Sequence, residues 1–227
     1  MPAVCPQGIR PGRLSAPDAG SVTRKVGQRL WLEAGRMAFE RVRLGMMRAA
    51  RGEVAFYEQV EHDPASTRDA LTVVLIASAA GAVGAFLGQL FRGHIAAAFG
   101  SLIAQAVVGV VLFYIWAFLV FLVGTNLFKG TADFGEVQRS LGFAWAPRVL
   151  DILGWLPLLG GLIGFVAWVW SVAIGFVAVR QALDLSDRDA LLTVIISAGV
   201  AAVIGLIFGF ILALFGLAGA MLSGAIG

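Results

Sequence analysis

The residues best suited to chemistry in this chain are an arginine and an aspartate three positions apart, Arg148 and Asp151, inside an otherwise apolar stretch. Residues three apart lie on one face of a helix, so the two charges can pair. Pairing matters because a single charge at the centre of a membrane helix costs roughly 2.5–3.5 kcal/mol. Pro147 removes a backbone donor and bends the chain, which frees nearby carbonyl groups. These three residues predict a polar hub within the apolar segments.

Two interpretations of this hub remain open from the sequence. In the first, the hub is a conduction or substrate site, with Asn126 and Gln105 as further polar lining, because transporters often bind substrate at broken helices near the bilayer midplane. In the second, the hub is structural, and Arg148 extends outward from a short, shallow helix. A water-accessible cavity shared by Arg148, Asp151 and Asn126 would favour the first interpretation.

The remaining polar residues do not indicate an enzyme. His62 and His94 fall at opposite ends of one apolar segment, so they cannot share a metal ion. The single cysteine, Cys5, provides neither a disulfide framework nor a cysteine metal site. Ser101 lacks the Gly-x-Ser-x-Gly setting of a nucleophile. We therefore expect no catalytic residues, no metal or cofactor site and no nucleic-acid partner.

The composition identifies the environment in which the hub must sit. Of the 227 residues, 59% are hydrophobic and only 14% are charged, whereas soluble domains carry roughly a quarter charged residues. Most of the chain after residue 70 consists of apolar runs, and about 20 apolar residues suffice for a helix to cross a bilayer. The sequence therefore predicts an all-α, polytopic integral membrane helical bundle.

The apolar runs can be divided into membrane spans. The tract from residue 152 to 179 has no charge, but Leu156-Pro157 and Gly160-Gly161 favour a break within it. We therefore expect five spans, with four as the alternative, and five spans place the two termini on opposite sides of the membrane. The expected spans are residues 70–91, 95–128, 140–156, 161–180 and 190–217.

Similar polar stretches precede the first and last spans. STRDALTVVLI begins at Ser66 and SDRDALLTVI begins at Ser186, and in each an aspartate follows three residues later, at Asp69 and Asp189. This spacing predicts two helix N-caps at the cytoplasmic face. The stretches are either an internal repeat or two independent solutions of the same capping problem. Eleven of the 17 Lys and Arg precede residue 70, which predicts a cytoplasmic N-terminus.

The segments outside the spans are also distinguishable. Residues 1–36 have no hydrophobic period and predict a disordered basic arm, or a stretch upstream of the true start. Residues 37–65 predict a cytoplasmic, juxtamembrane amphipathic helix and a linker, residues 66–217 the five-helix membrane domain, and residues 218–227 a tail.

Two pairs of glycines have the spacing that permits close helix packing. These are Gly84 with Gly88, and Gly205 with Gly209. They would pack either within the chain or in a homo-oligomer, and the sequence does not distinguish the two.

Three stretches together resemble the prokaryotic branch of the Yip family, the Rab/Ypt-interacting membrane proteins, over about residues 53–215. The stretches are FYEQVEHDPASTRDALTVVLI, FLVGTNLFKGTADFGEVQRSLGFAWAPRVL and LPLLGGLIGFVAWVWSVAIGFVAVRQALDLSDRDAL, and LFKGTADFGEVQRSLGFAWAP is the most specific part. The resemblance implies five membrane helices, a cytoplasmic N-terminus and a non-enzymatic role. Eukaryotic relatives associate with Rab-type GTPases, but their Asp-Leu-Tyr-Gly-Pro motif has no match here.

Two functions are therefore expected. The first is a membrane scaffold or organising protein, embedded in a bacterial inner membrane as a multi-pass protein. It would use the loop 129–138, the segment 180–189 and the N-terminal helix to contact an unidentified membrane or cytoplasmic protein. The second is a small transporter or channel built on the polar hub.

Overall fold

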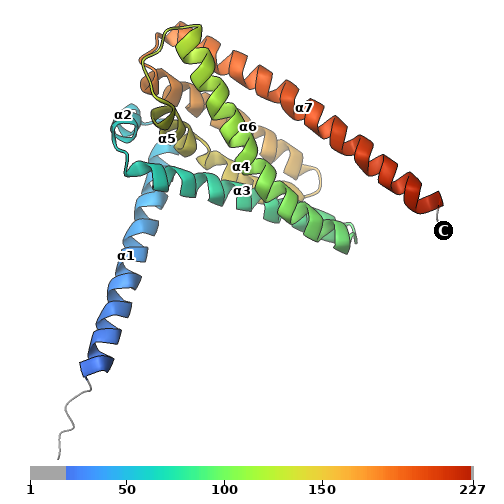
Figure 1. The fold of residues 1–227 in the computed structure, drawn as a ribbon, viewed down its shortest axis with the longest axis horizontal. Helices are drawn as coiled ribbons and strands as arrows, with labels where there is room; N and C mark the ends of the chain where they lie inside the picture. The colour runs from blue at the N-terminus through green and yellow to red at the C-terminus, as the bar shows by residue number, and fades with distance from the viewer. Residues whose placement is uncertain (1–18, 226–227) are drawn as a thin grey trace, which may run out of the picture. The chain divides into compact units, whose positions relative to one another are not determined.

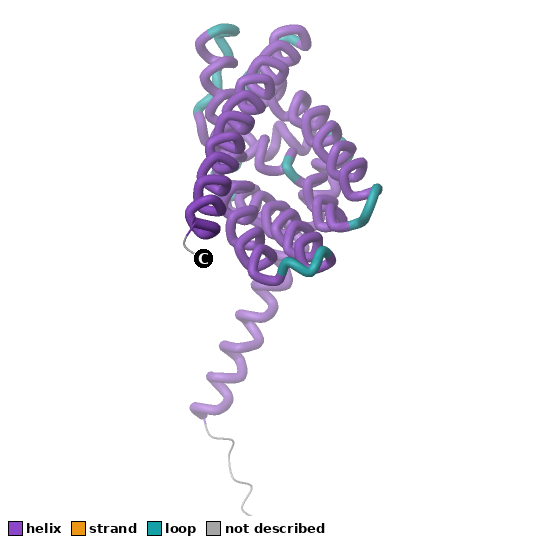
Figure 2. Tube along the Cα trace, turned by 90° about the vertical axis from the view of Figure 1, so that its right-hand side faces the viewer, coloured by secondary structure: helices purple, strands orange, loops and turns teal. Residues whose placement is uncertain are grey.

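The computed structural model describes residues 19–225 of the chain, and these residues form helices joined by short connections, with no strand among them (Figures 1 and 2). Eight elements follow one another in this part of the chain. They are α1 (Ala19–Ala50), α2 (Val54–His62), α3 (Ser66–Phe91), α4 (Ile95–Asn126), α5 (Phe134–Ala144), the 3₁₀-helix η1 (Ala146–Trp155), α6 (Leu159–Ala182) and α7 (Asp187–Ala225).

The chain divides into two compact units, residues 1–39 and 40–227. The described part of the first unit is helical from Ala19, so the expected disorder of residues 1–36 does not hold for residues 19–36. A continuous run of helix-compatible residues outweighs the isolated glycines there, and residues 1–18 lie outside the described part. In the second unit, the end of α1 buries Val42 and Ala49. The amphipathic face expected after residue 37 therefore packs, from Val42 onward, against protein.

Helices α3 and α4 form an antiparallel pair joined by residues 92–94. Their close approach depends on Gly109, because a Cβ at that position would lie 2.7 Å from Ser78 Oγ. Among the described residues, four helical stretches are able by length and composition to cross a membrane: α3, α4, α6 and residues 187–207 of α7. These four correspond to the first, second, fourth and fifth expected spans.

The third expected span, residues 140–156, is not a single α-helix. It consists of the end of α5 and the whole of η1, so five membrane-spanning helices are not confirmed. The change of helix type occurs at Pro147, which has no N–H to continue the α-helical hydrogen bonds. From there the chain adopts the tighter pattern, and Arg148 N–H donates to Trp145 O at 3.0 Å.

Together α5 and η1 follow α3 from one end to the other. A Cβ on Gly142 of α5 would lie 3.0 Å from Ala70 Cβ, near the start of α3. Further along, Gly84 abuts the Asp151 carbonyl, and Gly88 faces Trp155. A 3₁₀-helix rises about 2.0 Å per residue instead of 1.5 Å, so the ten residues of η1 extend about 20 Å.

Helix α6 returns along η1, and α7 runs away again beside α4 (Figure 1). The expected break between the third and fourth segments is present at Leu156-Pro157, where Leu158 adopts a left-handed φ of 65°. Gly160 then packs against the Gly154 carbonyl. Any side chain at Gly160 would prevent η1 and α6 from lying this close.

The two similar polar stretches begin their helices differently. Ser186 precedes α7, and its Oγ accepts from the Asp189 N–H at 3.3 Å while donating to the Asp189 carboxylate at 2.8 Å. Ser66 does not cap α3, because the helix begins at Ser66 itself. Its hydroxyl instead donates to Asp63 at 2.8 Å, and Asp69 faces Arg41 at 3.8 Å. Asp63 also accepts from the Ala65 N–H at 3.0 Å, within the turn that precedes α3.

Candidate functional site

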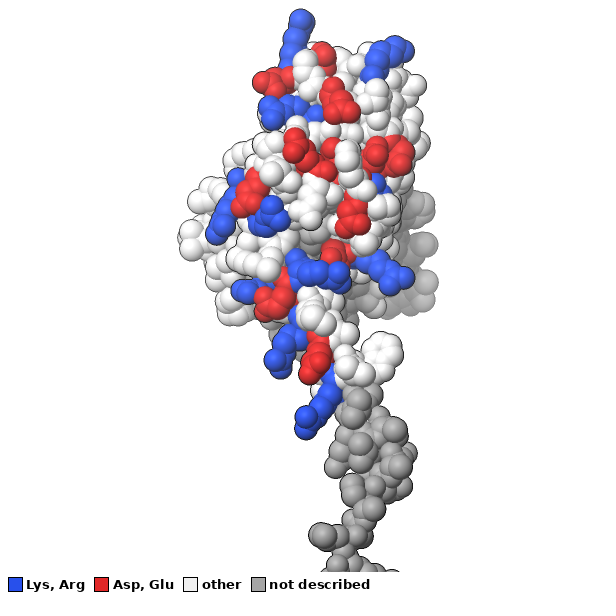
Figure 3. Space-filling model, turned by 90° about the vertical axis from the view of Figure 1, so that its left-hand side faces the viewer, with Lys and Arg blue, Asp and Glu red and all other residues white. Residues whose placement is uncertain are grey.

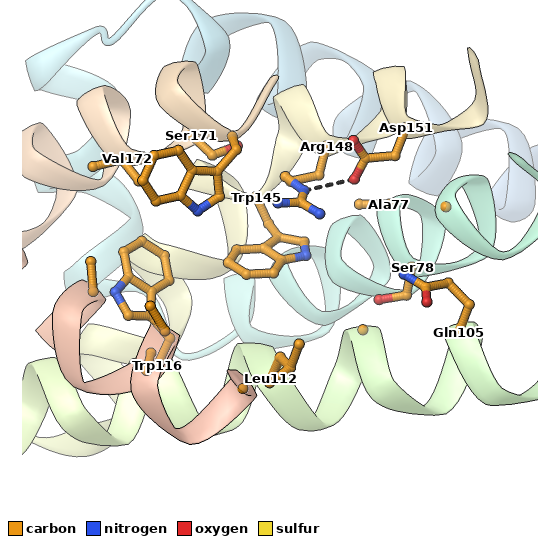
Figure 4. Close-up of a pocket in the computed structure, with 17 residues that line it drawn as sticks. Ala77, Ser78, Gln105, Leu112, Trp116, Trp145, Arg148, Asp151, Ser171 and Val172 are labelled. Carbon is orange, nitrogen blue, oxygen red and sulfur yellow. Dashed lines mark hydrogen bonds and ion pairs between the residues drawn. The ribbon is translucent and has the colours of Figure 1, made fainter. Parts of the chain in front are cut away.

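A cavity of about 250 Å³ lies inside the second unit, between four helices and η1 (Figure 4). Small residues border it: α7 contributes Ala198, Ala201, Ala202 and Gly205, which recur at helical spacing on one face. Nothing lies within 4 Å of a Cβ built on Gly205, so this glycine borders open space. The cavity is lined by Ala77, Ser78, Gly81, Gln105, Gly109, Leu112, Trp116, Trp145, Arg148, Asp151, Trp168, Ser171, Val172, Ala198, Ala201, Ala202 and Gly205.

An ion pair forms one wall of this cavity. Arg148 Nε donates to Asp151 Oδ2 at 2.7 Å, and the two side chains are only 26% and 16% exposed. Side chains at i and i+3 eclipse one another in a 3₁₀-helix, so the helix type of η1 itself brings them together. The guanidinium also lies 5.6 Å from the ring centre of Trp145, a distance at which a cation is attracted to an aromatic face.

Three buried polar atoms on the cavity lining have no hydrogen-bond partner within the described chain. They are the hydroxyls of Ser78 and Ser171 and the indole Nε1 of Trp116. The three residues are 6%, 3% and 5% exposed. Buried polar groups in folded proteins are nearly always paired with protein or with ordered water. Each of these atoms is therefore a group that ordered water or a bound polar molecule would satisfy.

A second cavity of about 300 Å³ adjoins the first and shares Gly81, Gln105, Arg148 and Asp151 with it. It continues along α3 to Arg92, at the end of that helix. The ion pair thus lies where a deep, tryptophan-lined cavity meets a shallower one that reaches the end of the bundle.

The structure brings together most, but not all, of the predicted hub. Arg148, Asp151 and Gln105 line the cavities, and Pro147 is buried at the first turn of η1. Asn126 does not take part, because it lies at the end of α4 and donates to Leu122 O at 2.9 Å. Asn126 follows Gln105 by 21 positions on the same helix, which places the two residues about 30 Å apart.

Sequence reasoning missed the tryptophans and the two serines of the cavity. Indole rings in apolar helices are more often core residues, so Trp116, Trp145 and Trp168 gave no distinct signal. Ser78 and Ser171 each interrupt a long apolar run, and that interruption was the available signal.

The glycine pairs have different surroundings. Gly84 and Gly88 face the backbone of η1, which covers that side of α3 within the same chain. Gly205 borders the cavity, and the surroundings of Gly209 lie outside the described part.

Charged side chains gather at the opposite end of the second unit, on the face that Figure 3 shows. This charged end comprises α2, the start of α3, residues 127–139 and residues 180–189. It is held together by contacts between elements: buried Arg139 donates to the Val60 and Glu61 carbonyls at the end of α2. Gln181 donates to Glu58 at 3.2 Å. A capping box of Asp133 with Glu136, not anticipated from the sequence, begins α5.

Glu61 at the charged end gives a pH-dependent prediction. Burial raises the pKa of its carboxyl, opposed by His62 and reinforced by Asp184, Glu136 and Glu58. A raised pKa in the folded state adds stability at low pH that is lost as pH rises above the ordinary value near 4.3. We expect Glu61→Gln to stabilise the protein at pH 7, where the parent carboxyl must ionise in a buried site, and to have little effect at pH 4.

Thermal unfolding of the purified protein at the two pH values measures this effect. The matched control is Glu33→Gln, at an exposed position of α1, which should change the midpoint less. Equal midpoints for Glu61→Gln and the parent protein at pH 7 would contradict the prediction.

The described residues contain no group of three His, Cys, Asp or Glu side chains that could hold a metal ion. The four long apolar helices found in residues 19–225, which are otherwise also helical, identify the chain as a multi-pass integral membrane protein. Its sequence matches the Yip1 domain over residues 53–209, so the chain belongs to the Yip family. No curated protein and no solved structure matches it.

Proposed function

We propose that the protein is a non-enzymatic organising protein of a bacterial inner membrane, from the prokaryotic branch of the Yip family, and that its charged end contacts a partner protein. The observation that carries this proposal is the construction of the charged end. Elements distant in sequence are fixed to one another there by Arg139, by Gln181 with Glu58, and by Thr131 with Asp184 at 3.1 Å. A preformed polar surface loses little conformational entropy on binding.

We also propose that the chain crosses the membrane five times, with the N-terminus in the cytoplasm. The support is the course of α5 and η1, which accompany α3 from Ala70 to Gly88 and so traverse the same thickness. Basic residues support the orientation, because the charged end carries Lys129, Arg139, Arg180 and Arg188, whereas Arg92 lies at the other end.

Cysteine labelling tests this topology. In a Cys5→Ser background, single cysteines at His94 and Leu158 should react with a membrane-impermeant maleimide in intact cells or spheroplasts. Cysteines at Lys129 and Arg188 should react only after the membrane is opened. Leu158 is the deciding position, because it is 98% exposed and follows η1. Protection of Leu158 together with Lys129 would mean that η1 turns back and that the chain crosses four times.

Site-specific photo-crosslinking tests the partner proposal. A photoreactive residue at Gln59 or Arg188, both exposed at the charged end, should yield the same protein adduct from native membranes. The controls are His94 at the opposite end and Val203 on the apolar surface of α7. No adduct from either test position, or the same adduct from His94, would refute a partner-binding role for the charged end.

The cavity supports a second candidate function, that of a small transporter. A path would have to continue from Trp116 towards the charged end. In the described structure the bundle there is filled by Val120, Val137 and Leu141, each at most 1% exposed. Transport would therefore require these side chains to separate, whereas binding requires no such movement.

A further inference from the structure

We propose that the two adjoining cavities form a binding site for a small amphipathic carboxylate, with its apolar body among the tryptophans and its carboxylate near Arg148. This inference is independent of the organising role, because the cavities lie in the apolar part of the bundle and not at the charged end. Three properties of the cavities support it: their shape, their hydrogen-bonding groups and their charge.

The shape favours an occupant with an apolar body. Three indoles, Trp116, Trp145 and Trp168, and the alanines of α7 line the deeper cavity. Indole rings provide large, flat apolar surfaces with few rotatable bonds, which suits a planar or short-chain molecule. The cavity volume of about 250 Å³ lies slightly below the usual range for drug-sized ligands, so the body must be small.

The hydrogen-bonding groups favour an occupant rich in acceptors. An indole N–H is a donor only, and so is a guanidinium. Trp116 Nε1 has no partner, and both Nη groups of Arg148 make no hydrogen bond to the described residues. The hydroxyls of Ser78 and Ser171 are likewise unpartnered. A carboxylate supplies two oxygens with several acceptor positions and no donor.

The charge of the lining also favours an anion. The charged side chains on the two cavities are Arg148, Asp151 and Arg92, which leaves one positive charge in excess. Arg92 folds back along α3, since its Nη2 lies 3.6 Å from a Cβ built on Gly88. One arginine thus lies in the second cavity at the end of α3 and the other at the ion pair, where the surrounding apolar residues strengthen electrostatic attraction.

Tryptophan fluorescence measures the proposed binding directly. The full chain, in nanodiscs of uncharged phosphatidylcholine, is titrated with 4-iodobenzoate, whose iodine quenches indole fluorescence on contact. We expect saturable quenching of part of the emission, since three of the six tryptophans line the cavity. The neutral analogue 4-iodobenzamide, of the same size, should bind at least tenfold more weakly. Absence of saturable quenching, or equal affinity for the two probes, overturns the proposal.

Variants locate the site without relying on the ion pair, whose loss affects folding. Ala201→Phe fills the deeper cavity and should abolish saturable quenching, whereas Ala104→Phe, at an exposed position of α4 outside the lining, should not. Arg92→Gln should weaken 4-iodobenzoate binding at least fivefold with an unchanged unfolding midpoint, and Arg92→Lys should restore it. Unchanged binding by a folded Ala201→Phe protein overturns the assignment of the site to this cavity.

Discussion

Arg148→Ala is expected to destabilise the protein by about 2–3 kcal/mol, below the usual cost of breaking a fully buried ion pair, because the two side chains are 26% and 16% exposed. The substitution leaves the Asp151 carboxylate in an apolar surrounding without its cation. It also removes the guanidinium that lies over Trp145. Because η1 joins α5 to α6, an unpaired charge there affects the third and fourth segments together.

A double-mutant cycle separates the loss of the pair from the loss of packing. Arg148→Met and Asp151→Leu should each destabilise, because each leaves one charge unpaired, whereas the two substitutions together should recover most of the stability by replacing both charges with apolar side chains. Thermal unfolding in detergent and the yield of folded protein are the measurements. Unchanged insertion and folded yield for Arg148→Ala would show that the pair is not a structural element of the bundle.

Gly84→Ala is expected to be the second most damaging change, at about 1–3 kcal/mol, the usual cost of overpacking a filled core. A Cβ at this position would collide with the Asp151 carbonyl and lie 3.2 Å from the Ile152 carbonyl. Both atoms belong to the backbone of η1, so relief requires the whole 3₁₀-helix to move away from α3. Displacement of η1 would also shift the ion pair that it carries.

The matched control is Gly199→Ala in α7, where nothing lies within 4 Å of the added Cβ. It should leave the unfolding midpoint unchanged or raise it slightly, because alanine is the better helix former. The two variants differ only in what the new methyl group meets. Equal midpoints for Gly84→Ala and Gly199→Ala would contradict the packing of η1 against α3.

The sequence alone was sufficient to predict those elements whose structure is decided by their length and apolarity. The four long helices begin and end within a few residues of the expected spans, except that α7 continues to Ala225. The break after Leu156 was also predictable, since proline and adjacent glycines act locally. The 3₁₀ form of η1 was not, because an apolar run of this length has the same composition as an α-helix. Its form depends on Pro147 together with packing against Gly84.

The site was predictable where chemistry is unusual for its surroundings. Two charges in an apolar run identified Arg148 and Asp151, and their spacing correctly indicated a common face. The prediction was wrong for Asn126, because polarity alone does not give depth along a helix. The prediction also missed the tryptophans, because a tryptophan that borders a cavity and one that fills a core give the same sequence signal. What distinguishes the two is the set of small residues opposite, on α7.

The 3₁₀ geometry of η1 also makes this segment adjustable in length. Rewinding its ten residues into an α-helix would shorten it by about 5 Å, close to one helical turn. The angle about the helix axis between the Arg148 and Asp151 side chains would change, while the two ends of the segment stay joined to α5 and α6. The bundle therefore contains one segment, η1, whose length can change, among long α-helices of fixed length. This segment carries the ion pair.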